Sequence, residues 1–108
     1  MTTVITDLEQ ALPVPKDGIA SRPLMDLKGS TKLVLFALDQ DQEISAHSAP
    51  FPAQVLLLDG AIRVMVDDVW QDLEPGEQKS LPQGRPHAVK ASTSAHFLLT
   101  MRRGAKAD

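Results

Sequence analysis

Two isolated histidines, His47 and His87, are the residues of this sequence that best suit chemistry. His47 stands in the stretch Ala-His-Ser-Ala-Pro, and His87 stands in Gly-Arg-Pro-His-Ala, each at the edge of a strand-like run. An imidazole can bind a metal or act as a general acid or base, because it ordinarily titrates near neutrality. A fold that brings the two rings face to face would therefore create a functional pocket.

The composition limits the classes of protein to consider. At 108 residues and 43% hydrophobic content, the chain has the size and composition of one globular domain. Eleven basic residues against fourteen acidic ones give a net charge of −3. No basic stripe with interleaved aromatic residues is present, and this argues against a nucleic-acid partner.

The chain contains no cysteine. This excludes disulfides, thiolate metal ligands and cysteine nucleophiles. The N-terminal residues show no secretory signal, and the longest apolar stretch, 55–58, is far too short to span a bilayer. We therefore expect a cytoplasmic protein with no membrane partner.

Short apolar runs separated by turn residues predict an all-β domain. A short helix is predicted over residues 7–12, before two prolines, and the predicted strands cover 32–38, 54–58, 62–66, 69–73, 80–82, 87–90 and 95–101. The two-residue loop Asp67-Asp68 predicts a hairpin between two of these strands. No segment is available for helical crossovers, so a sandwich or barrel is expected rather than a parallel α/β sheet.

The stretch from Gly76 to Ala91 resembles the second signature motif of the cupin superfamily. Gly76, Pro82, Gly84 and His87 keep the spacing of that motif, and Ala91 replaces its asparagine. Four matches at the family spacing make this the more specific of the two motifs.

The stretch from Asp41 to Gly60 resembles the first cupin motif in part. His47 takes the place of the first histidine, and Gly60 closes the motif. Asp41 replaces the first glycine, Ala49 the second histidine and Gln54 the glutamate. The sequence His-Ser-Ala-Pro-Phe-Pro-Ala is similar to that of small single-domain bacterial cupins of the RmlC-like type.

This resemblance implies an all-β, single-domain jelly-roll barrel with a short irregular or helical N-terminal arm. We expect the arm over residues 1–28, the barrel over 29–103 and a disordered tail over 104–108. The resemblance also implies a homodimer.

In the cupin family, three histidines and one glutamate hold a metal. The corresponding set here is reduced to His47, Gln54 and His87, which would line a ligand pocket. Two imidazoles and an amide oxygen would hold a divalent ion such as Zn, Ni, Fe or Mn only weakly, because the amide brings no charge. The other interpretation is a metal-free pocket whose histidines bind water, backbone or ligand.

Two functions follow from these alternatives. The first is a small-molecule-binding cupin that is non-catalytic or weakly catalytic. The second is a metal-dependent enzyme of the dioxygenase or isomerase type that acts on a small organic substrate. Phe51, between two prolines, would serve either as a lid over the pocket or as a loop anchor.

The alternation of side chains along strands gives two further expectations. If Gln54 points into the barrel, Val55 and Leu57 face outward, where a second subunit or the arm must cover them. On the last strand, the apolar set that includes Phe97 and Leu99 is expected inside, which leaves His96 on the outer face.

Overall fold

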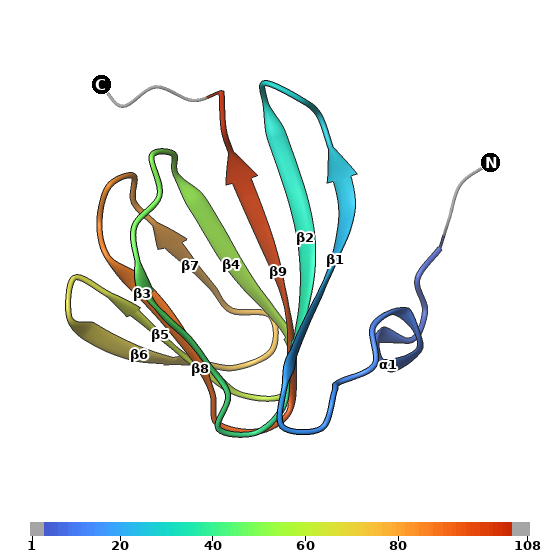
Figure 1. The fold of residues 1–108 in the computed structure, drawn as a ribbon. Helices are drawn as coiled ribbons and strands as arrows, with labels where there is room; N and C mark the ends of the chain where they lie inside the picture. Colours follow the sequence, from blue (N-terminus) through green and yellow to red (C-terminus); the bar gives the residue numbers. More distant parts are fainter. Residues whose placement is uncertain (1–3, 105–108) are drawn as a thin grey trace.

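Two antiparallel sheets face each other in the computed structural model, which describes residues 4–104 (Figure 1). The first sheet has the strand order β1 (Ile19–Asp26), β2 (Thr31–Leu38), β9 (Ala95–Arg102), β4 (Ala53–Asp59) and β7 (Gln78–Leu81). The second has the order β3 (Glu43–His47), β8 (His87–Ala91), β5 (Ile62–Val66) and β6 (Val69–Leu73). The predicted all-β architecture is confirmed.

The β5–β6 hairpin forms where the sequence predicted it. Its ladder closes with Val66 opposite Val69. The two loop residues, Asp67 and Asp68, have φ angles of 51° and 67°. A two-residue hairpin turn of type I′ has positive φ at both central residues, and Asp tolerates this region better than most side chains.

The core lies between the two sheets and is built mainly from alternate residues of β4, β5, β8 and β9. On β2 and β9, Phe36 and Phe97 stack with ring centroids 4.9 Å apart. On β4, Val55 and Leu57 are fully buried and lie opposite Leu99 and Phe97 in the ladder. The expectation that Phe97 and Leu99 face the interior is confirmed.

The orientation expected for β4 is wrong. Because Val55 and Leu57 point into the core, Gln54 and Leu56 point to the outer face of the sheet. The strand is apolar at both alternations, so its own pattern did not determine which face is inward. Val55 and Leu57 therefore need no second subunit to cover them, and the homodimer stays a prediction.

The N-terminal segment carries the short helix α1 (Leu8–Ala11). Asp7 caps it, since its carboxylate accepts the backbone N–H groups of Glu9 and Gln10 at 3.0 and 3.2 Å. Farther along, β1 pairs with β2, although it falls within the residues assigned to the arm. Of the tail expected to be disordered, residues 105–108 lie outside the described residues.

No helix among the described residues is long and apolar enough to cross a membrane.

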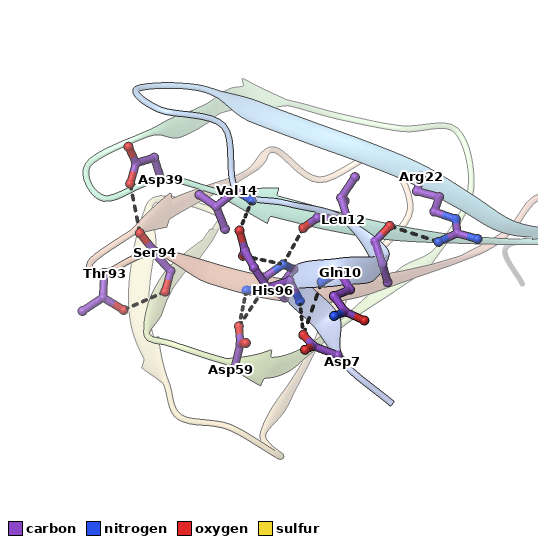
Figure 2. Close-up of polar contacts among 12 residues, drawn as sticks. Asp7, Gln10, Leu12, Val14, Arg22, Asp39, Asp59, Thr93, Ser94 and His96 are labelled. Carbon is purple, nitrogen blue, oxygen red and sulfur yellow. Dashed lines mark hydrogen bonds and ion pairs between the residues drawn. The ribbon is translucent and has the colours of Figure 1, made fainter. Parts of the chain in front are cut away.

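His96 lies on the outer face of β9, as expected, but it is buried there, with only 3% of its surface exposed. Figure 2 shows the polar contacts around it. Its backbone N–H and Nδ1 lie 2.7 and 2.9 Å from a carboxylate oxygen of Asp59 on β4. Its Nε2 lies 2.8 Å from the backbone oxygen of Leu12, just after α1. The histidine therefore joins the arm to the sheet and is not a pocket residue.

Candidate functional site

The structure brings His47 and His87 together across two neighbouring strands. His47 ends β3 and His87 begins β8, and the two are directly opposite each other in the ladder. Their Nε2 atoms are 3.1 Å apart, and their rings meet edge to face with centroids 4.4 Å apart. The predicted juxtaposition of the two imidazoles is therefore present.

The loops that follow β3 and precede β8 hold this pair in place. The backbone N–H of Gly84 donates to the Ala49 oxygen at 2.9 Å and so joins the two loops. Gly84 has a φ of 74°, which glycine adopts without strain. Both loops lie at the end of the molecule where the two sheets spread apart (Figure 1). Arg85 turns away to pair with Asp67 at 2.6 Å.

Two hollows meet at the histidine pair. The inner one, of about 80 Å³, is almost entirely apolar and is lined by Phe36, Ile44, His47, Val55, Leu81, His87, Val89, Phe97 and Leu99. The outer one, of about 220 Å³, is lined by His47, Ala49, Phe51, Ala53, Leu81, His87, Leu99 and Met101. Because four residues line both, the two hollows adjoin each other, and we call them the apolar inner chamber and the wider mouth of the pocket.

The electrostatics of the pocket favour a neutral His87. Its side chain is 7% exposed. Burial lowers the pKa of His87 below its ordinary value of 6.5, and the neighbouring His47 lowers it further, while the backbone of Arg85 acts in the opposite direction. At neutral pH the imidazole of His87 is therefore uncharged.

Comparison with solved structures identifies the fold. A conserved protein of unknown function from Streptococcus pyogenes matches with 29% identity and a TM-score of 0.86, over 99% of this chain and 92% of that one. An RmlC-like cupin from Desulfovibrio desulfuricans matches with 22% identity and a TM-score of 0.81, over 95% of this chain and 98% of that one. A cupin superfamily protein from Desulfitobacterium hafniense matches with 19% identity and a TM-score of 0.82, over 88% and 86%. The chain has the cupin fold.

No protein-family model matches the sequence, and neither does any curated protein. The three-dimensional likeness therefore establishes the cupin architecture, and the function must be argued from the pocket itself. The predicted single-domain jelly-roll fold is confirmed.

Gln54 does not join the two histidines in this cupin pocket. It faces the outer side of β4 and lines a different hollow of about 190 Å³, together with Ser80, Thr100 and Arg102. The inward-facing neighbours of Gln54 are Ala53 and Val55, which bring only apolar groups to the mouth and the chamber. Of the three residues predicted to converge, two do so and the third lies on the opposite face.

The cupin metal set does not fit the residues of this pocket. The two Nε2 atoms could share one ion, because two imidazoles on a tetrahedral ion lie roughly 3.3 Å apart. However, no group of three or more His, Cys, Asp or Glu side chains within the described residues is placed to hold a metal. Ala49 stands where the family has its second histidine, and no carboxylate takes the place of the glutamate.

The sequence did not identify the remaining pocket residues. The register between β4 and β9 is needed to assign Ala53, Leu99 and Met101 to the pocket, since Ala53 lies opposite Met101 in that ladder. Phe51, for which a lid and a loop anchor were both open, lines the mouth.

Proposed function

We propose that this cupin binds a small organic molecule with a largely apolar body and one polar group, and that it is non-catalytic or weakly catalytic. The observation that carries the proposal is the position of the His47–His87 pair, at the junction of the apolar chamber and the mouth. Pockets of this kind bind through their apolar walls and orient the ligand through a few polar groups.

The size of the pocket supports a ligand of about one ring. An apolar cavity of about 150 Å³ is enough to bind benzene. The mouth measures about 220 Å³ and adjoins the chamber of about 80 Å³. A six-membered ring with a small substituent therefore matches the available space.

The lining supports binding rather than efficient chemistry. Of the described residues that line the two hollows, only His47 and His87 are ionisable, and none carries a hydroxyl group. The pocket thus has a potential acid and base but neither a nucleophile nor a carboxylate. A molecule held here would be oriented by the imidazoles without a second catalytic group beside it.

A titration with phenol, followed by methyl NMR, tests this proposal. We expect saturable shifts of the methyl signals of Val55, Leu81 and Leu99, which line the pocket. Ala53→Phe fills the mouth and should abolish them. Gln54→Phe adds the same ring to the outer face of the same strand and should leave them unchanged. Shifts that survive Ala53→Phe, or that appear only outside the pocket, would contradict the proposal.

A metal-dependent enzyme is the second candidate. The observation in its favour is the 3.1 Å separation of the two Nε2 atoms, which suits two ligands on one weakly held divalent ion. Titration calorimetry with Zn²⁺, Ni²⁺ and Mn²⁺ tests it on the parent and on His47→Ala. Saturable binding that His47→Ala removes would favour the enzyme, and no heat with any of the three ions would contradict it.

A further inference from the structure

The hydrogen bonds of His47 determine which of its nitrogens carries the proton. Its Nδ1 lies 2.8 Å from the backbone oxygen of Ser45. A carbonyl oxygen can only accept, so Nδ1 must be the donor. A neutral imidazole has one N–H, and the Nε2 of His47 is therefore a bare acceptor.

The proton of His87 follows from that of His47. The two Nε2 atoms are 3.1 Å apart, and two bare nitrogens would repel each other at this distance. The Nε2 of His87 must therefore carry the proton and donate it to His47. This leaves the Nδ1 of His87 bare. Among the described residues that atom is buried and has no hydrogen-bond partner.

We propose that the pair recognises a hydroxyl group on the small apolar ligand. The hydroxyl replaces the hydrogen bond between the two histidines: it donates its hydrogen to Nε2 of His47 and accepts the N–H of His87 through the same oxygen. This inference rests on the proposed function, since it assigns the polar group of the molecule bound in the pocket. The class of ligand is then a phenol or a small alcohol.

Other polar groups match the pair less well. A carboxylate and an ether only accept, so they leave the bare nitrogen of His47 without a donor. An ammonium group only donates and leaves the N–H of His87 unsatisfied. A hydroxyl offers both functions at one atom, and an oxygen can lie within about 3 Å of both Nε2 atoms because these are so close together.

Long-range ¹H–¹⁵N NMR tests the proton positions directly, because it distinguishes a protonated ring nitrogen from a bare one. At mildly alkaline pH we expect the Nδ1–H form of His47 and the Nε2–H form of His87 in the free protein. The opposite form at either ring would overturn the inference and would leave the proposed pocket untouched.

Affinity for four one-ring probes tests the recognition itself. We expect phenol to bind about tenfold more tightly than benzene, anisole and benzoate, because its hydroxyl makes two hydrogen bonds in place of the one that joins the two histidines in the free protein. His47→Leu should remove the preference for phenol while benzene still binds, and this shows that the variant is folded. Gln54→Leu, on the outer face, should keep the preference.

The outcomes separate the two proposals. Equal binding of phenol and benzene, or tightest binding of benzoate, would overturn the hydroxyl inference and leave the small-molecule function standing. Failure of all four probes to bind would overturn the proposed function for a ligand of this size, and the inference with it.

Discussion

Nε2 of His96 lies 2.8 Å from the backbone oxygen of Leu12, across a sequence separation of 84 residues. Nδ1 of the same ring lies 2.9 Å from the Asp59 carboxylate (Figure 2). A carboxylate oxygen of Glu9 is 3.9 Å from Nε2. Both direct partners can only accept, so both bonds form together only when both ring nitrogens carry a proton. The imidazole lies between two carboxylates and attaches the arm to the sheet.

The first prediction is that His96→Ala detaches the N-terminal arm. Loss of the two hydrogen bonds should cost about 1–3 kcal/mol of unfolding free energy, at about 0.5–1.5 kcal/mol for each bond. We expect faster hydrogen exchange in α1, measured by mass spectrometry. His47→Ala removes a histidine from the pocket instead and should leave α1 exchange unchanged. If α1 is equally protected in His96→Ala, contacts other than this histidine hold the arm.

The second prediction concerns Asp39, whose carboxylate joins three segments. It accepts the N–H groups of Asp17 and Gln40 at 2.7 and 2.8 Å and the hydroxyl of Ser94 at 2.9 Å. The bond from Asp17 lowers the pKa of Asp39 most, followed by that from Gln40 and then that from Ser94. Because the folded-state pKa lies below the unfolded value, this group stabilises the fold above the unfolded pKa of about 3.8. That contribution is lost as the pH falls through the folded value.

The substitution Asp39→Asn should therefore lower the free energy of unfolding at neutral pH. In this variant that free energy should also fall less steeply as the pH is lowered. Urea unfolding at a series of pH values measures both effects. Ser94→Ala removes one of the three donors and should have a smaller effect in the same direction. An acid decline of unchanged steepness in Asp39→Asn would show that other carboxyl groups cause it.

The third prediction compares two glycines with similar backbone conformations. Gly60 and Gly76 have φ angles of 79° and 91°, so a side chain at either position is strained by about 1–2 kcal/mol. A Cβ at Gly60 would also lie 2.2 Å from the Ser94 oxygen, whereas nothing lies within 4 Å of one at Gly76. Chemical denaturation should therefore show a clearly larger loss for Gly60→Ala than for Gly76→Ala. Equal losses would mean that the loop at Ser94 moves aside freely.

The sequence was informative where a local signal determines the structure. The acidic pair Asp67-Asp68 identified its hairpin because few residues tolerate positive φ, and the motif spacing identified His47 and His87 as neighbours. It was not informative about Gln54, because β4 is apolar at both alternations. Only the pairing of β4 with β9 determines which of its faces is inward, and this pairing joins residues some 40 positions apart.

The last prediction is that a carboxylate on β4 completes a tight metal site only when it is placed on the inward face of that strand. Ala49 and Ala53 line the mouth beside His47 and His87, so Ala49→His with Ala53→Glu would add an imidazole and a charged oxygen. Each added ligand should raise Zn²⁺ affinity about tenfold or more in titration calorimetry, since an anionic oxygen offsets the charge of the ion. Gln54→Glu is the matched control, because it adds the same carboxylate on the outer face and should leave Zn²⁺ affinity unchanged. If Gln54→Glu strengthens binding as much as Ala53→Glu, then Gln54 reaches the histidines in solution and the orientation described for β4 is wrong.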